Sequence, residues 1–363
     1  MKTKPIRHSM PTLDHREIDA LADTIRSNHI AAGDQVALFE DEMARYCGAS
    51  GAVGCSSGTA ALHLALLAIG VGQGMEVIIP SFTCASLYHA VTYTGAVPVL
   101  ADCDPDTFLL TAPTIMARIT HRTKAVIVPH MFGLPADMKE IVSLGLPVIE
   151  DISQAIGATY MGRRTGCLSE VAVSSFYATK LITTGTGGMV LSGNPRVLGK
   201  VRELNGVDKK KDLNCHLPYM MNDLQASMGR CQLRKLDDFI SKRRDLASHL
   251  SLALKSIPAA PPGDLSFREH IFFRYCVKIH KPVEPVLAFL RRNGIEAARP
   301  IFSPLHLLDK RETATSGGDF PGTMEAWRET ISLPIHPGLT NKEVLREACL
   351  LGDILNVMAY SNA

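Results

Sequence analysis

The sequence predicts an α/β protein with a mostly parallel sheet in a large domain, followed by a smaller α+β domain at the C-terminus. Short runs rich in β-branched and aliphatic residues alternate with helical segments from residue 52 onward. These runs are apolar throughout, which is typical of parallel strands that are covered by helices on both faces. The chain has 363 residues, more than one ordinary domain holds.

Seven strands are expected in the large domain, with helices between them. The strands are predicted at residues 52–55, 76–80, 97–101, 125–129, 147–151, 171–175 and 188–192. The intervening helices are predicted at residues 59–69, 84–94, 111–119 and 138–143. Two helices precede the first strand: one follows Thr12 or Asp14, either of which can cap it, and one covers residues 35–46. Ligands of such a sheet bind beyond the carboxyl ends of its strands.

The smaller domain is expected to follow a proline-rich loop at residues 258–264. A single long charged helix is predicted before it, over residues 222–254. The large domain is therefore expected to comprise residues 1–254, and the small domain residues 255–363. A strand and two helices are expected in the small domain, at residues 272–279, 283–293 and 341–357. The polar stretch at residues 317–319 predicts a mobile loop over a site.

Composition and charge exclude several classes of protein. The 38 basic and 36 acidic side chains give a net charge of +2 and are spread along the chain, which argues against a nucleic-acid or membrane partner. There is no apolar signal core at the N-terminus and no apolar run that could span a bilayer, so a cytoplasmic protein is expected. The nine cysteines are scattered without a C-x-x-C pair, which fits reduced thiols. The histidines lack metal-ligand spacing, and we expect no metal.

The segment at residues 55–60 follows a predicted strand and begins a helix. Ser57, Gly58 and Thr59 would combine small side chains with the unpaired N–H groups of a helix N-terminus, where a phosphate can approach closely. The alternative is an ordinary serine or threonine cap of that helix.

Two charged residues follow later apolar strands. Asp151 ends a strand at the expected ligand crevice, where its carboxylate could pair with a protonated ring nitrogen or simply cap a turn. Lys180 follows the strand at residues 171–175 and precedes the glycine-rich residues 185–188. Apolar neighbours would disfavour its ammonium form and leave an amine that can attack an aldehyde, whereas an isolated lysine here would be a surface residue. The spacing to Asp151 and to the Gly-Thr motif favours the reactive amine.

Taken together, these residues resemble the DegT/DnrJ/EryC1/StrS family of pyridoxal-phosphate (PLP)-dependent aminotransferases, most of which act on nucleotide-linked keto-sugars. The resemblance covers nearly the whole chain. Its most specific stretches are residues 56–64, 77–83, 133–138, 150–155, 157–160, 175–180, 304–306 and 333–340.

This resemblance implies PLP fold type I, which is aspartate-aminotransferase-like, and a homodimer with its active sites at the interface. Lys180 matches the lysine that holds the cofactor as an imine and moves the proton, and Asp151 matches the acid that pairs with the pyridine nitrogen. Gln154 matches a residue near the ring hydroxyl, Ser175 a phosphate-binding serine, and Gly58 with Thr59 the phosphate-binding helix start. The implied substrates are an amino-acid donor such as L-glutamate and a keto-sugar, in cell-surface glycan or natural-product biosynthesis.

Three positions depart from the family pattern. Cys84 stands where an aromatic residue usually stacks on the cofactor ring, and Phe82 or Tyr88 are possible replacements. Pro218 stands where an asparagine usually reaches the phosphate of the partner subunit; Asn214 or Asn222 could substitute for it. Thr186 replaces an acidic residue.

Alternative functions remain open. They are a PLP enzyme that acts on a non-sugar intermediate and a non-catalytic regulatory protein that binds PLP or sugar. A dehydratase is disfavoured because its lysine would be replaced by histidine, whereas Lys180 is retained.

Overall fold

The computed structural model describes residues 4–206, 216–255, 267–309 and 320–360. Its centre is a seven-stranded sheet in the order β1-β9-β8-β5-β4-β2-β3. The strands are β1 (Gly51–Cys55), β2 (Glu76–Pro80), β3 (Val97–Ala101), β4 (Thr123–Pro129), β5 (Val148–Asp151), β8 (Val171–Ser175) and β9 (Gly188–Ser192). Strand β9 runs antiparallel to β1 and β8, and every other pair in this sheet is parallel. All seven predicted strands are confirmed to within two residues at their ends, and so is the mostly parallel sheet.

Helices cover both faces of the sheet. Successive residues of β8 point to opposite faces, because Val171 and Val173 belong to one core cluster and Ala172 to another. The first cluster includes residues of α3 (Gly58–Ala68), α4 (Ala85–Tyr93) and α7 (Pro195–Leu204). The second includes residues of α2 (Asp34–Cys47), α8 (Asp223–Leu233) and α9 (Leu236–Leu254). The predicted helix at residues 35–46 is therefore confirmed, whereas α7 was not predicted.

The remaining elements of the large domain are short or peripheral. Helix α1 (His15–Arg26) begins at Asp14, which caps it in a reciprocal capping box with Glu17. The other elements are α5 (Ala112–Met116), α6 (Met138–Val142), the 3-10 helix η1 (Met131–Gly133) and the small three-stranded sheet of β6 (Thr159–Tyr160), β7 (Arg163–Arg164) and β10 (Arg268–Glu269).

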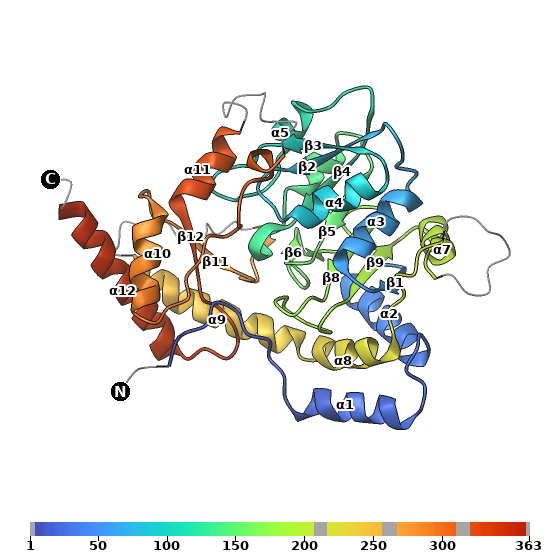
Figure 1. Ribbon diagram of the computed structural model, residues 1–363, viewed down its shortest axis with the longest axis horizontal. Coiled ribbons are helices and arrows are strands. Elements are labelled where there is room, and N and C mark those ends of the chain that lie inside the picture. The colour runs from blue at the N-terminus through green and yellow to red at the C-terminus, as the bar shows by residue number, and fades with distance from the viewer. Residues whose placement is uncertain (1–3, 207–215, 256–266, 310–319, 361–363) are drawn as a thin grey trace.

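The prediction of one helix over residues 222–254 is wrong, because α8 ends at Leu233 and α9 begins at Leu236. The ammonium group of Lys235, at the junction, is buried and forms ion pairs with Glu17 and Asp14 of the α1 segment. This tertiary contact lies at the break between α8 and α9, and no local sequence pattern predicts it. Figure 1 shows the two helices following each other along the lower side of the molecule toward the C-terminal elements.

The C-terminal part contains β11 (Tyr275–Lys278), α10 (Val283–Arg292), the 3-10 helix η2 (Leu305–Leu307), α11 (Pro321–Glu329), β12 (Thr330–Leu333) and α12 (Asn341–Tyr360). Strands β11 and β12 pair antiparallel, so this part is α+β as predicted, although α11 and β12 were not expected. Its core also takes in Ile6 and Leu246, Leu250 and Leu254 of α9. The backbone of Ile6 bonds to Gly294 and Glu296, so the N-terminal segment lies against the C-terminal part. The domain boundary after residue 254 stays a prediction, since residues 258–264 and the predicted loop at 317–319 lie outside the described residues.

Candidate active site

A cavity of about 570 Å³ lies beyond the carboxyl ends of β4, β5 and β8, where the sheet topology predicts a ligand site. All of the site residues expected from the sequence line it. They are Ser57, Gly58, Thr59, Cys84, Asp151, Gln154, Ser175 and Lys180.

The start of α3 forms a cradle of hydrogen-bond donors. The Ser57 hydroxyl accepts a hydrogen bond from the Ala60 N–H at 3.1 Å, so the capping function considered for this motif is present. Among the described residues, the N–H groups of Gly58 and Thr59 have no hydrogen-bond partner. Ser175 lies so close that a Cβ on Gly58 would stand 3.0 Å from its Oγ. Two free amides, a hydroxyl and a missing side chain fit a phosphate group.

Asp151 is buried at the end of β5, between β4 and β8. Its Oδ1 accepts a hydrogen bond from the Ser153 N–H at 2.9 Å, which is the turn-capping contact that the sequence left open. Its Oδ2 makes no hydrogen bond with a residue that the structure describes. One oxygen therefore fixes the carboxylate, and the other is available to a ligand in the cavity.

The side-chain amide of Gln154 is oriented by the backbone. Its Oε1 accepts a hydrogen bond from the Phe132 N–H at 2.9 Å. Phe132 has a positive φ of 58°, which is uncommon for a residue other than glycine, and this contact holds it in place. With its oxygen occupied, Gln154 presents its NH₂ group, which is a donor, to the cavity.

Lys180 lies in the turn that follows β8 and is half-buried. Burial lowers the pKa of its amine below the ordinary 10.5, with a further decrease from Arg274; Cys84 and Asp151 act in the opposite direction. The Nζ atom lies 5.5 Å from the centroid of the Phe273 ring. A half-buried amine with a lowered pKa, beside a carboxylate, is suited to attack a carbonyl carbon.

Phe82, Tyr88 and Asn222, which could have replaced missing family residues, do not line the cavity. Phe82 is buried and stacks on Phe108, and the Tyr88 hydroxyl donates a hydrogen bond to Asp309. The Asn222 side chain caps α8, and Asn214 lies outside the described residues. Cys84, directly before α4, is exposed and lines the cavity; that it stands at the cofactor ring stays a prediction.

Several lining residues were not predicted from the sequence, and two of them come from the segment before β11. Phe273 and Arg274 enter the cavity from the C-terminal part, just before β11. The available signal was a lone arginine inside the apolar run at residues 271–277. A charged residue within such an apolar run is expected to be at least partly buried, and a partly buried charge indicates a binding role.

Metal and membrane sites were not expected. Within the described ranges, no group of three or more histidine, cysteine, aspartate or glutamate side chains could hold a metal ion. No helix in the described part of the chain is both long and apolar enough to cross a bilayer.

A mostly parallel sheet, a donor cradle at a helix start, a carboxylate with one open oxygen and a lysine of lowered pKa define an enzyme of the PLP fold type I class. The chain belongs to the DegT/DnrJ/EryC1/StrS aminotransferase family, whose model matches residues 11–348. It is therefore a PLP-dependent aminotransferase, as the resemblance implied.

Individual relatives agree with this assignment. The chain is 35% identical to GDP-perosamine synthase of Caulobacter vibrioides, over 95% of this chain and 97% of that protein. The aminotransferase TlmJ of Streptoalloteichus hindustanus superposes with a TM-score of 0.91 at 29% identity, covering 98% of this chain and all of TlmJ. DesV of S. venezuelae superposes with a TM-score of 0.89 at 31% identity, covering 96% and 99% of the two chains.

Proposed function

We propose that this aminotransferase moves the amino group of an amino acid, with L-glutamate as the first candidate, to a keto-sugar that is linked to a nucleotide. The observation that carries the proposal is the position of Lys180, a half-buried amine of lowered pKa in one cavity with Asp151 and the donor cradle. The choice of a nucleotide-linked keto-sugar is supported by the 35% identity to GDP-perosamine synthase over nearly the full length of both proteins.

Each residue of the site has a proposed role. PLP, when bound, supplies an electron-withdrawing ring that stabilises negative charge at the carbon losing a proton. Gly58, Thr59 and Ser175 would donate hydrogen bonds to its phosphate, and Asp151 would keep a proton on its ring nitrogen. Gln154 would donate to its ring oxygen through Nε2. Ser57 supports the cradle as the cap of α3, and Cys84 borders the ring position.

Lys180 would have two functions in turn. Its Nζ would hold the cofactor covalently, and after displacement by the substrate amine it would become a free base. As a neutral amine, Nζ can take the proton from the substrate carbon and deliver it to the cofactor carbon. The lowered pKa keeps a larger fraction of Nζ unprotonated at neutral pH than an ordinary lysine would have.

A homodimer with active sites at the subunit interface is part of the proposal. Phe302 and Tyr177 line the cavity and yet are 91% and 54% exposed. Exposed aromatic groups at the mouth of a site are suited to contact with a second copy of the chain. We also place the enzyme in the cytoplasm, since the eight described cysteines are free thiols.

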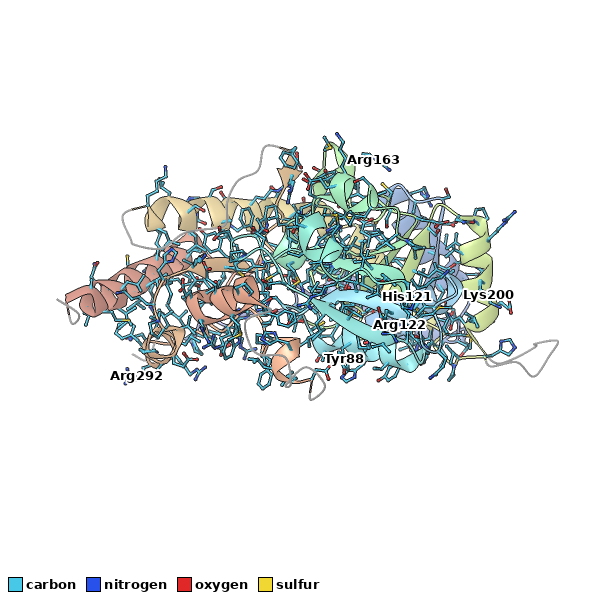
Figure 2. The ribbon with its side chains drawn as sticks, turned by 90° about the horizontal axis from the view of Figure 1, so that it is seen from above. Tyr88, His121, Arg122, Arg163, Lys200 and Arg292 are labelled. Carbon is cyan, nitrogen blue, oxygen red and sulfur yellow. The ribbon has the colours of Figure 1, made fainter. Side chains whose placement is uncertain are left out.

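Borohydride reduction of the holoprotein tests the central assignment. Peptide mapping by mass spectrometry should find the pyridoxyl group on Lys180, and K180A should carry none. Lys200, an exposed lysine of α7, offers the matched control K200A, which should be labelled normally (Figure 2). A label on another lysine would refute the assignment. Addition of L-glutamate should then change the cofactor spectrum to that of pyridoxamine phosphate, and an unchanged spectrum with every donor tried would favour a non-catalytic binding protein.

A further inference from the structure

Arg274 carries a positive charge into the active-site cavity without a carboxylate partner. Its guanidinium is half-buried, and among the described residues it forms no ion pair. Its only side-chain hydrogen-bond partner there is His8, whose Nε2 and Nδ1 lie 3.0 and 3.1 Å from Nη1. Nε and Nη2, the edge that matches the two oxygens of a carboxylate, have no hydrogen-bond partner among these residues.

The surroundings of Arg274 do not neutralise its charge. Burial and the charge of Arg274 lower the pKa of His8 to about 3, so this imidazole is uncharged at neutral pH. Arg243 is buried nearby and donates hydrogen bonds to the backbone carbonyl groups of Phe272, Phe273 and Ile335. The positive charge of Arg243 adds to that of Arg274. Arg274 lowers the pKa of Arg243, and Arg243 lowers the pKa of His336.

Among the described residues that line the cavity, Asp151 is the only one with a carboxylate. In the proposed function Asp151 pairs with the cofactor ring. A half-buried guanidinium without an opposite charge is unfavourable in the empty site, and an anionic ligand would remove that penalty. No acidic side chain of the described lining is therefore left to pair with Arg274, which enters the cavity from the C-terminal part.

We infer that Arg274 binds the α-carboxylate of the amino donor, with His8 as the residue that positions it; this inference rests on the proposed function. Lys180 Nζ and the Arg274 guanidinium lie 5.5 and 5.6 Å from the centroid of the same Phe273 ring. The two groups thus approach the same aromatic side chain, and the charge of Arg274 acts on Lys180, whose pKa it lowers. An α-carboxylate is bonded to the reacting carbon and must lie close to Lys180, whereas the diphosphate of a sugar nucleotide is separated from the aminated carbon by the sugar ring.

Two aminooxy reagents test this without requiring turnover. Both aminooxyacetate and methoxyamine displace Lys180 from the cofactor: the C=N bond to Nζ breaks, a C=N bond to the reagent nitrogen forms, and Nζ leaves as the free amine without any redox change. Only aminooxyacetate has a carboxylate. The ratio of their second-order rate constants, followed by absorbance in the holoenzyme, therefore reports recognition of the carboxylate.

The holoenzyme should prefer aminooxyacetate, and R274Q should lose roughly 10- to 100-fold of that preference. Any change in the reactivity of Lys180 itself, whose pKa Arg274 lowers, affects both reagents and cancels in the ratio. R274K keeps the positive charge but loses the paired N–H donors of the guanidinium, so its preference for aminooxyacetate should lie between those of the native enzyme and R274Q. The control R292Q makes the same change of charge at an exposed position of α10 and should behave as the native enzyme (Figure 2).

An unchanged ratio in R274Q would overturn the inference, as would an equal loss with both reagents. The melting temperature of R274Q should not fall, because no buried ion pair is broken. Failure of every amino donor in the native enzyme would refute the proposed function alone, since the reagent ratio does not depend on transamination.

Discussion

Gly58 provides the sharpest test of the phosphate cradle, because the structure leaves no room for a side chain there. A Cβ at this position would stand 2.6 Å from Cβ, 3.0 Å from Oγ and 3.3 Å from Cα of Ser175. Carbon atoms normally approach no closer than about 3.5 Å. The substitution G58A therefore has to push Ser175 and the start of α3 apart by roughly 1 Å, and it places a methyl group where the phosphate is expected.

The expected magnitude follows from two opposing effects. Overpacking of this size costs about 1–3 kcal/mol. Alanine favours a helix over glycine by at most about 1 kcal/mol, and Gly58 is the first residue of α3 with no positive φ that would penalise alanine. The net destabilisation of the apoprotein should thus be about 0–3 kcal/mol. The affinity for PLP should fall at least about tenfold, since the displaced Ser175 hydroxyl and the amides no longer point to one phosphate.

The assay is equilibrium binding of PLP to the apoprotein, together with urea unfolding of the same samples. The double variant G58A/S175G removes the Cβ that clashes and should regain stability, but not affinity, because the hydroxyl is lost. Gly199, in α7, is a matched control: nothing lies within 4 Å of its Cβ position, so G199A should gain up to about 1 kcal/mol and bind PLP normally. If G58A binds PLP as tightly as the native protein, the phosphate does not lie at this helix start.

Three further predictions concern ionisable and thiol groups. Because Asp151 raises the pKa of Lys180, D151N should shift the pH profile of PLP attachment to lower pH, and stopped-flow absorbance that finds a shift to higher pH would contradict this. Glu347 is fully buried with neither carboxylate oxygen hydrogen-bonded to a described residue, and burial raises its pKa well above 4.5. The folded state thus resists ionisation of Glu347. E347Q should change the free energy of unfolding little at pH 4 and raise it by about 1–3 kcal/mol at pH 8. A difference in urea unfolding that is the same at both pH values would refute the reasoning. Cys84 should be alkylated by iodoacetamide faster in the apoprotein than in the holoprotein, whereas the exposed Cys349 should react equally in both, and equal protection of the two thiols would place the cofactor elsewhere.

Much of the large domain could be predicted because its strands are short apolar runs that end in polar residues. The positions of Asp151 and Lys180 followed from the same pattern, since the ends of β5 and β8 lie side by side in a parallel pair. Gly58 and Ser175 were also expected, but their contact was not. That contact depends on the packing of α3 against β8, which the sequence does not encode locally.

Two of the features that escaped prediction depend on contacts between distant segments. Lys235 would continue a helix by its propensity, yet it lies at the break between α8 and α9, where its ion pair with Glu17 joins segments far apart in the sequence. Arg274 lines the site from the C-terminal part, and the N-terminal segment runs back to that part and brings His8 against it. Propensity and periodicity describe neighbours along the chain, and neither contact is of that kind.

The neighbouring residues Glu150 and Asp151 of β5 have different roles: one carboxylate stabilises the fold, and the other is available to a ligand. Side chains alternate along β5, so the two carboxylates point to opposite sides of the sheet. Glu150 is fully buried and accepts hydrogen bonds from the N–H groups of Gly166 and Leu168, and it also pairs with the ring of His130 at 3.0 Å. Asp151 has only one oxygen occupied. A carboxylate whose acceptors are all used stabilises the fold, whereas one with an open oxygen in a cavity is available to a ligand. The same distinction separates the paired Lys235 from Arg274, and it is the physical reason for placing a substrate carboxylate at the latter.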